Sequence, residues 1–437
     1  MSCLFIFRRD LRIQDNKGYN ECCKKYDIVY PCFIMDPKQL KNNSYKSERC
    51  IYFMYESLKE LNNDLDNKLN LFYGNPASVI KKLINKIKPK SVIVNMDYSP
   101  YSRKRDEKIK KACGKNVEFE SYEDLLLLPI GKIKTGGKMY RKFTPYYDKA
   151  KKIKISKEET KRAKKIIKLS DSKNIEYLKK FTNKKGIFTG GRSEALKILR
   201  NKNNFKSYGS KRDNLMYETT HLSAHIKFGT VSIREVYNSL KGLEALTRQL
   251  YWRDFYTNLG YFYPEFTEKR VFQPKLKNWN NKYLKEWKEG KTGIPIVDAT
   301  MRELNETGYC HNRGRLIASG FAKFLLLDWK ECEKYYATQL IDYDIFANHF
   351  NWNWSFSLGP FSTPWFRIMN VFIQGKKHDK NGEYIKKWVP ELKNVKAEDL
   401  HKWDKVYNKY DIKYPKPIIE YKEQRDKCYN FYKELYD

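Results

Sequence analysis

Two tryptophans lie two positions apart in the stretch NWNW at 351–354. In a helix each residue turns the chain by about 100°, so Trp352 and Trp354 are predicted to point to opposite faces of their element. A single tryptophan most often packs in a core, because its side chain buries a large apolar area. Two back-to-back indoles in so polar a segment cannot share one set of neighbours and need a separate explanation.

Charged residues gather around aromatic rings in three segments of the C-terminal half. The segments are YWRDFY at 251–256, GYCHNRGRL at 308–316 and IDYDIFANHFNWNWS at 341–355. A buried charge must be paired or must serve a ligand, because burying it alone is costly. The pattern fits a planar, polar and partly anionic cofactor with aromatic neighbours, and its charged members are Arg253, Arg313, Arg315, Asp342 and Asp344.

The elements that must position these residues change in type along the chain. Apolar or β-branched runs at 4–7, 28–34 and 91–96 predict buried strands, and the segments at 50–65 and 76–87 between them have helical spacing. Strand–helix alternation predicts an α/β N-terminal domain with a parallel, Rossmann-like sheet over residues 1–130.

A basic interdomain linker is predicted over 131–189. Its stretch from 149 to 185 has fifteen Lys/Arg against four Asp/Glu, and we expect a solvated helix lying over the surface there, in preference to a dedicated DNA-binding arm. Helical spacing with glycine stops dominates afterwards, so residues 190–437 are expected to form an all-α domain.

The net charge of +35 indicates a polyanionic partner such as nucleic acid, since Lys and Arg neutralise phosphates. The alternative is a lysine-rich composition that spreads ammonium groups over every surface. The N-terminus meets charges after a few apolar residues and no run could span a bilayer, so we expect a soluble intracellular protein of cytoplasm, nucleus or virion, without a membrane partner. The nine cysteines show neither CxxC spacing nor a His/Cys cluster, which predicts reduced thiols and no metal site.

Several longer segments carry a resemblance that covers nearly the whole chain. They are FRRDLRIQDN at 7–16, FTPYY at 143–147, TTHLSAHIKFGTVS at 219–232, YWRDFY at 251–256, KTGIPIVDATMRELNETGYCHNR at 291–313, LIDYDIFANHFNWNW at 340–354 and NGEYIKKWVPEL at 381–392. In order and spacing they resemble the photolyase/cryptochrome family, above all its class I cyclobutane pyrimidine dimer photolyases. The resemblance implies an N-terminal α/β domain and a helical domain that binds FAD.

The resemblance also implies which residues hold the flavin. Asn348 would face the flavin N5 nitrogen, and Arg315 paired with Asp342 would satisfy two buried charges at once. Hydroxyls and main-chain amides at a helix start suit the flavin's phosphates. The implied phosphate-binding residues are Tyr208, Thr219, Thr220, His221, Leu222 and Ser223, and those around the ring are Arg253, Arg315, Asp342, Tyr343, Asp344 and Asn348.

The resemblance also implies why the two indoles of the NWNW stretch face opposite ways. Trp352 corresponds to the flavin-proximal member of an electron-transfer chain that continues through Trp329 and Trp279. Trp354, on the other face, would line the pocket for the DNA lesion, and Trp252 would form its other wall. Two aromatic faces suit a pyrimidine pair flipped out of the base stack. The implied DNA-contacting residues are Arg212, Gln249, Trp252, Asn312, Arg313 and Trp354.

The activity implied is blue-light-driven repair of cyclobutane pyrimidine dimers, in which excited reduced FAD donates an electron to the lesion. Gln249 stands where dimer photolyases usually have a glutamate, which keeps (6-4) photoproduct repair as an alternative that Asn312 opposes. The third interpretation is a cryptochrome-like photoreceptor without repair activity. It is opposed by the 45 residues that follow Leu392, which are too few for the long signalling tail of plant or animal cryptochromes. A second antenna chromophore of folate or deazaflavin type is in question because Ser99 replaces the usual carboxylate, and we expect a monomer.

Overall fold

The N-terminal region of the chain forms a parallel sheet in the computed structural model, which describes residues 1–157, 159–265, 279–358 and 366–436. Five strands lie in the order β3-β2-β1-β4-β5, with all neighbours parallel, and Leu4 of β1 pairs with Tyr30 and Val92 on its two sides. The strands are β1 (Ser2–Phe7), β2 (Ile28–Met35), β3 (Asn70–Tyr73), β4 (Ser91–Asn95) and β5 (Glu118–Tyr122). This confirms the predicted α/β fold.

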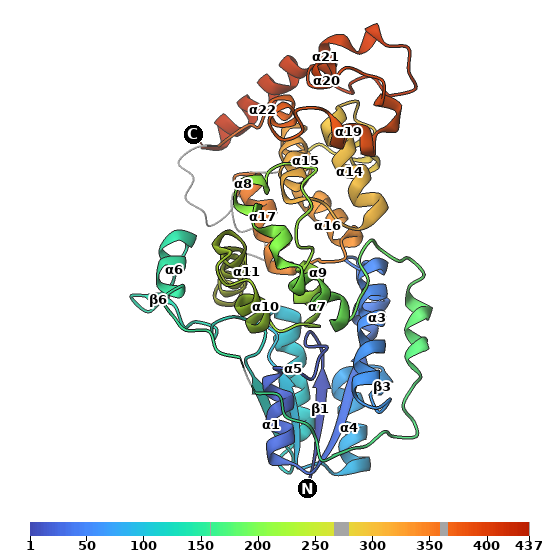
Figure 1. Ribbon diagram of the computed structural model, residues 1–437, viewed down its shortest axis with the longest axis vertical. Helices are drawn as coiled ribbons and strands as arrows, with labels where there is room; N and C mark the ends of the chain where they lie inside the picture. Colours follow the sequence, from blue (N-terminus) through green and yellow to red (C-terminus); the bar gives the residue numbers. More distant parts are fainter. Residues whose placement is uncertain (158, 266–278, 359–365, 437) are drawn as a thin grey trace. The chain divides into compact units, whose positions relative to one another are not determined.

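Helices cover both faces of this sheet (Figure 1). Alternate side chains of a strand point to opposite faces, so Phe5 and Phe7 pack with buried residues of α1 and α3, whereas Leu4 and Ile6 pack with those of α4 and α5. The helices of this region are α1 (Lys17–Lys25), α2 (Pro37–Leu40), α3 (Glu48–Asp64), α4 (Pro76–Ile87) and α5 (Pro100–Cys113). Both helices predicted here, at 50–65 and 76–87, are confirmed.

The predicted surface helix over 149–185 is wrong. After α6 (Phe143–Ala150) the described residues up to Asn174 contain no α-helix, and the short strand β8 (Lys165–Ile166) pairs in parallel with β2 instead. Lysines three or four positions apart repel one another along a helix. The start of β2, which β3 does not cover, offers the backbone hydrogen bonds that the helix would have supplied, from Lys165 N to Asp27 O and from Ile167 N to Val29 O.

The remaining elements are helical, apart from a small hairpin of β6 (Lys134–Thr135) and β7 (Lys138–Met139). The chain divides into two compact units. Unit 1 comprises residues 1–206, 220–264 and 341–346, and unit 2 comprises residues 207–219, 265–340 and 347–437. The later helices of unit 1 are η1 (Ile175–Phe181), α7 (Arg192–Arg200), η2 (Lys202–Phe205), α9 (Ser223–Phe228), α10 (Ile233–Ser239) and α11 (Glu244–Phe262).

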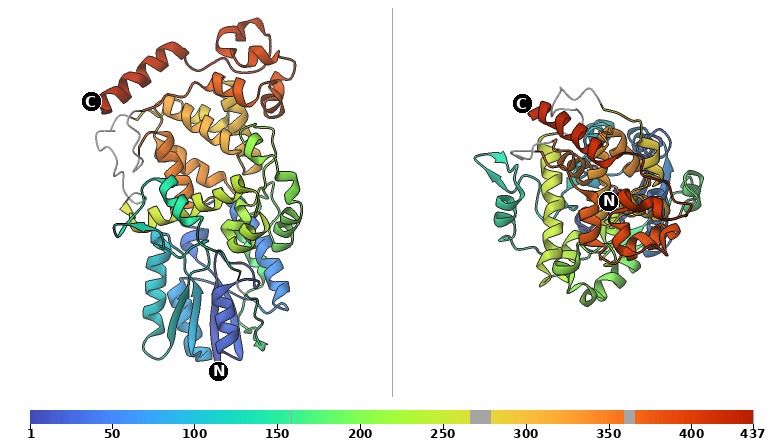
Figure 2. Two further views of the ribbon diagram at one scale, coloured as in Figure 1. Left: turned by 60° about the vertical axis from the view of Figure 1, so that its left-hand side comes forward. Right: turned by 90° about the horizontal axis from the view of Figure 1, so that it is seen from above.

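The described residues of unit 2 contain helices and no strand, as predicted (Figure 2). Trp287 and Trp403 are completely enclosed among them, which fits the packing role usual for tryptophan. The helices are α8 (Tyr208–Lys211), α13 (Leu284–Glu289), α14 (Pro295–Thr307), α15 (Asn312–Phe324), α16 (Trp329–Gln339), α17 (Ile345–Ser355), whose first two residues belong to unit 1, α18 (Val371–His378), α19 (Glu383–Trp388), η3 (Pro390–Leu392), α20 (Ala397–Leu400), α21 (Trp403–Val406), η4 (Tyr407–Lys409) and α22 (Tyr421–Tyr436). Among the described residues no helix is both long and apolar enough to cross a membrane.

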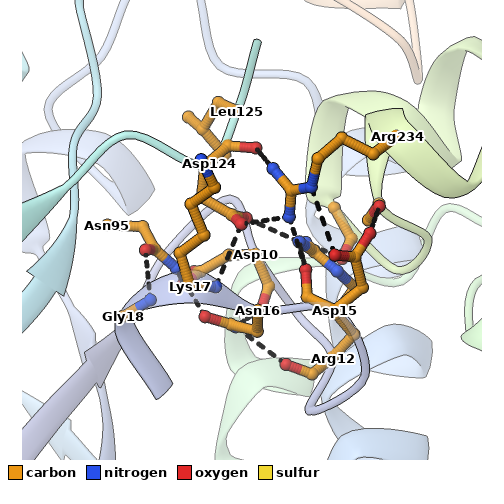
Figure 3. Close-up of polar contacts among 12 residues, drawn as sticks. Asp10, Arg12, Asp15, Asn16, Lys17, Gly18, Asn95, Asp124, Leu125 and Arg234 are labelled. Atoms are coloured by element: carbon orange, nitrogen blue, oxygen red, sulfur yellow. Dashed lines mark hydrogen bonds and ion pairs between the residues drawn. The ribbon is translucent and has the colours of Figure 1, made fainter. Parts of the chain in front are cut away.

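A buried network of charges joins the sheet of unit 1 to α10 (Figure 3). The carboxylate of Asp124 accepts from Arg12 at 2.6 Å and from Arg234 at 2.7 Å, and all three side chains are at most 4% exposed. Asp15 accepts from Arg234 Nε at 3.2 Å. Ionic partners on two sides compensate the loss of hydration, so this network fixes α10 against the carboxyl end of the sheet.

Candidate functional site

Helix α17 separates the two tryptophans of the NWNW stretch as its periodicity predicts. Trp352 is 4% exposed, and its ring centroid lies 5.2 Å from that of Tyr336 and 5.9 Å from that of Phe356. Trp354 is 45% exposed. One indole is therefore part of the helical core, and the other is presented at the surface of unit 2, where it can contact a partner.

Two further tryptophans of the predicted electron-transfer chain lie in unit 2. The ring of Trp279 is 5.8 Å from Phe356, which also contacts Trp352, so one phenyl ring lies next to both indoles. Trp329 packs edge to face on His349 at 5.4 Å, with the Lys330 ammonium 4.3 Å from its ring.

Asn348, the residue predicted to face the flavin, is held by α16. Its side-chain nitrogen donates to the Glu333 carbonyl at 3.4 Å. The carboxylate of Glu333 lies 3.5 Å from His349 Nδ1, and both side chains are 2% exposed. Sequence reasoning missed Glu333 and His349; a His directly after the predicted Asn is the only signal that could have drawn attention to this pair.

The predicted phosphate-binding run 219–223 combines hydroxyls with an unusual backbone. Within unit 2 the hydroxyl of Thr219 lies 3.1 Å from that of Tyr309. Within unit 1 the Thr220 hydroxyl accepts from Leu222 N at 3.4 Å, His221 has a left-handed φ of 53°, and Ser223 begins α9.

Two more predicted cofactor residues of unit 2 lie close to these elements in the chain. Tyr208 begins α8, and burial raises the pKa of its hydroxyl. Arg315 Nε donates to the Cys310 carbonyl at 2.9 Å, and its guanidinium lies 5.9 Å from the Tyr309 ring.

The segment 341–346 is attached to the N-terminal strand region of unit 1. Asp344 forms an ion pair with Arg9 at 2.7 Å and also accepts from Phe346 N at 3.1 Å. Arg9 reaches Asp97 at 3.5 Å as well. The Tyr343 ring lies 6.1 Å from Tyr45. Arg9 was not predicted as a site residue, because nothing local in the sequence links positions 9 and 344.

Helix α11 presents Gln249, Trp252 and Arg253. Gln249 Nε2 donates to Ala245 O at 3.2 Å, and Arg253 donates to Leu125 O at 2.6 Å. One face of Trp252 is covered by Phe143 of α6, with centroids 3.6 Å apart and planes 9° apart. The predicted lesion wall is therefore an aromatic stack, and Phe143 of the FTPYY motif is a further member that sequence reasoning did not assign.

Next to Arg253, Asp254 is a fully enclosed carboxyl group. Its Oδ2 accepts from Leu127 N at 2.9 Å and from Leu128 N at 3.3 Å, and within the described ranges its Oδ1 has no hydrogen-bond partner. Burial raises the pKa of Asp254 to about 7, against the opposing influence of the Arg253 charge and the two backbone N–H groups.

Apart from Trp354, the predicted DNA-contacting residues of unit 2 lie at the start of α15 and the end of α8. Asn312 and Arg212 are exposed, and Arg313 forms an ion pair with Asp213 at 2.8 Å. Burial raises the pKa of Asp213, but the hydrogen bond and charge of Arg313 outweigh it and hold the pKa below its ordinary value. Asp213 therefore orients Arg313, a role that its position next to Arg212 did not suggest.

Ser99, the position of the expected antenna carboxylate, caps a helix in unit 1. Its hydroxyl accepts from Ser102 N at 3.2 Å at the start of α5, as N-cap serines do. Ser102 in turn donates to Asp97 at 2.8 Å. Ser99, which stands in place of the acid, therefore stabilises the start of α5.

Two family models match this chain. Residues 3–164 match the model described as DNA photolyase, and residues 246–434 match the FAD binding domain of DNA photolyase. The chain belongs to the DNA photolyase family. The family match agrees with the resemblance and with the predicted change from an α/β to a helical domain.

Relatives of this photolyase are similar over nearly their whole length. The deoxyribodipyrimidine photo-lyase of Buchnera aphidicola subsp. Acyrthosiphon pisum is 34% identical, covering 99% of this chain and 96% of its own. The protein of the same name from Escherichia coli K12 is 33% identical, covering 97% and 96%. Among solved structures, the archaeal photolyase from Sulfolobus tokodaii with two FAD molecules is 40% identical with a TM-score of 0.91, covering 100% of both chains.

The pKa of Asp254 in this photolyase predicts how stability depends on pH. A carboxyl group whose pKa is higher in the folded state stabilises the fold below its unfolded value of about 3.9 and loses that contribution as the pH rises through about 7. Asp254→Asn keeps a neutral acceptor, so from about pH 5 to 9 wild type should lose on the order of 1–4 kcal/mol relative to the variant. Urea unfolding across this range measures it, with the exposed Asp148→Asn as control; parallel curves for wild type and D254N would contradict the prediction.

Proposed function

We propose that this chain is a deoxyribodipyrimidine photo-lyase, a carbon–carbon lyase that uses blue light to repair cyclobutane pyrimidine dimers in DNA and acts as a monomer. The observation that supports this best is the exposed Trp354 on α17, whose other face buries Trp352, in a chain that is 33–34% identical to full-length relatives of that name. An aromatic surface of this kind suits a flipped-out base pair, because every base offers a stacking face.

The groups present fit FAD as the cofactor, held by residues 190–437, which follow the α/β domain (1–130) and the linker (131–189) in the chain. The hydroxyls of Thr219, Thr220 and Ser223 can donate to a diphosphate, and Arg315 supplies a positive charge. Bound in its reduced form, FAD supplies the electron that excitation by light makes available for splitting the lesion. The other residues proposed to hold it are Tyr208, His221, Leu222, Arg253, Asp342, Tyr343, Asp344 and Asn348.

The residues proposed to act on the DNA divide the work between bases and backbone. Trp252 and Trp354 stack on the lesion, and the Gln249 and Asn312 amides can donate to and accept from its carbonyl and imide groups. Unlike a carboxylic acid, the Gln249 amide has no acidic proton that it could transfer to the lesion. Arg212 and Arg313 neutralise phosphates, and Asp213 holds Arg313 in place before DNA arrives.

Trp352, Trp329 and Trp279 are proposed to carry electrons inward from the surface. Replacing Trp352 by phenylalanine should abolish the light-driven loss of oxidised-flavin absorbance in the presence of a thiol reductant, because a phenyl ring is far harder to oxidise than an indole. The chemically reduced variant should still repair DNA. Trp403→Phe, which changes an equally buried tryptophan, is the matched control; equal photoreduction in W352F and W403F would rule out the chain.

A second chromophore is supported by a relative. The similar structure from Sulfolobus tokodaii is described with two FAD molecules, which are said to imply a novel light-harvesting cofactor. In this chain Ser99 leaves no carboxylate at the position expected for a pterin or deazaflavin. We propose that the antenna of this chain is a flavin. Extraction of the purified protein should release about two FAD per chain if antenna and catalytic sites are both filled; folate or deazaflavin in the extract would contradict the proposal.

The activity is tested with reduced protein, blue light and two defined oligonucleotides, one with a cyclobutane thymine dimer and one with a (6-4) photoproduct. Chromatography should show light-dependent restoration of the first alone, with no change in the dark. Restoration of the second alone would assign the chain to (6-4) repair and would mean that Gln249, not Asn312, indicates the lesion that the enzyme repairs. Binding of FAD without repair of either would favour a photoreceptor.

A further inference from the structure

Lys323 is a buried cation that the proposed reaction does not use. It is 2% exposed in α15. Its ammonium donates to the Ser357 hydroxyl at 2.7 Å and to the Arg367 carbonyl at 2.8 Å. It also lies 4.2 Å from the centroid of the Tyr432 ring. An ammonium has three donor directions and all three are used, so the side chain is held by α22 on one side and by the chain after α17 on the other.

No carboxylate among the described residues pairs with this ammonium. The titratable groups next to it are Tyr432 and Cys428 of α22, and the Cys428 thiol donates to the Lys323 carbonyl at 3.7 Å. Burial lowers the pKa of Lys323 to about 8, with a small opposing influence of Cys428. Burying a cation without an anionic partner opposes folding, so its presence calls for a role other than stability.

The turn that Lys323 contacts ends the helix that presents Trp354. Leu358 N donates to Asn353 O at 2.8 Å and Ser357 N donates to Trp354 O at 3.0 Å. These two bonds form the Schellman arrangement, whose left-handed position is usually glycine. Here that position is Ser357, with φ 55°. A side chain disfavours this conformation, and the hydrogen bond from Lys323 to the Ser357 hydroxyl compensates for it.

A second contact from the same face of α15 holds the same helix end. Ser319, one turn before Lys323, donates to the Ser355 hydroxyl at 2.9 Å, and residues four apart lie on one face of a helix. Helix α15 also carries Asn312 and Arg313 at its start. The two contacts therefore fix the end of the helix with the exposed indole to the helix with the proposed lesion-contacting amide and guanidinium.

We propose that Lys323, through Ser357, is a positioning residue that sets the orientation of Trp354 for lesion recognition. The inference rests on the proposed function of Trp354 in binding the pyrimidine dimer. The proposal distinguishes recognition of the lesion from binding to the phosphates of the DNA. Loss of the ammonium should impair recognition of the lesion and leave the contacts with phosphates intact, because Lys323 is buried and does not reach the DNA backbone.

The decisive experiment is a rescue. K323M should weaken binding to dimer-containing duplex DNA about tenfold, the loss of one misplaced stacking contact, and should leave binding to undamaged duplex unchanged. S357G alone should bind like wild type, because glycine adopts φ > 0 freely. In the double variant K323M/S357G, glycine makes the ammonium unnecessary and affinity for the dimer should return. K433M, which removes an exposed charge from α22, is the matched control.

The outcomes of these binding measurements distinguish the proposal from its alternatives. Equal loss for damaged and undamaged DNA would mean that Lys323 contributes charge alone, and dimer binding of K323M at the wild-type level, or no recovery in the double variant, would overturn the proposal. Should K323M not fold, S319A removes only one hydroxyl and should weaken dimer binding in the same direction; unchanged binding would overturn the proposal. A wild-type protein that does not prefer dimer-containing DNA would instead refute the proposed function.

Discussion

Replacing Asp124 by asparagine is expected to lower the free energy of unfolding by about 3–5 kcal/mol, the usual loss when one partner of a buried ion pair is removed. The variant would leave the guanidinium groups of Arg12 and Arg234 without the carboxylate that both contact at 2.6–2.7 Å. Each would remain almost completely enclosed. Urea unfolding followed by circular dichroism measures the change.

A matched control is available on the surface. Asp171→Asn removes the carboxylate of an ion pair with Lys86 whose side chains are 54% and 44% exposed, and exposed pairs contribute at most about 1 kcal/mol.

Asp124 should also make the protein sensitive to acid. Burial raises its pKa, but the charges of Arg12 and Arg234 outweigh this and hold the pKa below its ordinary value. A carboxylate with a lowered folded pKa stabilises above its unfolded value of about 3.9 and loses that contribution as the pH falls. D124N should therefore lose less stability on acidification than wild type; similar losses in D124N and D171N at neutral pH would contradict the argument.

Trp354→Ala is expected to weaken binding to dimer-containing DNA by about 5- to 150-fold, which corresponds to about 1–3 kcal/mol for loss of stacking on a base. Because the indole is 45% exposed, the melting temperature should hardly change. Binding to undamaged duplex should also hardly change, since phosphate contacts drive it. Fluorescence anisotropy with matched damaged and undamaged duplexes gives both affinities.

Two variants make the Trp354 result specific. Trp354→Phe keeps an aromatic face and should retain most of the affinity. Tyr429→Ala removes an aromatic side chain of similar exposure, 44%, from α22 and should have no effect on either duplex. Equal weakening by W354A and Y429A, or equal loss on damaged and undamaged DNA, would exclude a lesion-stacking role.

Local periodicity predicted the elements of the fold that depend on neighbouring residues. Helix α4 occupies 76–87 as its spacing indicates, and the opposite surroundings of Trp352 and Trp354 follow from their two-residue separation. Strands β3 and β5 were not predicted: β3 has only four residues, and β5 is an edge strand with exposed Glu118. Such short or half-exposed strands depend on their neighbours in the sheet more than on their own composition.

The candidate site could be predicted only where a motif contains the residues themselves. Trp252, Asn312 and Arg313 lie within segments that carry the family resemblance, so their roles could be expected. The stack of Phe143 on Trp252 and the ion pair of Arg9 with Asp344 join residues 109 and 335 positions apart. No spacing rule relates such positions, because only the completed fold brings them together.

Two charged partners of the N-terminal sheet region are synthesised much later than the sheet itself. A ribosome delivers Arg12 and Asp124 early, whereas Arg234 follows 110 positions after Asp124, and Asp344 follows 335 positions after its partner Arg9. At a synthesis rate of about 5–20 residues per second, Asp344 is added to the chain roughly 20–70 seconds after Arg9. During this interval the nascent sheet lacks some of its neutralising charge. Residues 1–206 expressed alone would keep the pairs of Arg9 with Asp97 and of Arg12 with Asp124 but would lack Arg234 and Asp344, so these charges of the α/β half are fully compensated only when later segments of the chain have been synthesised.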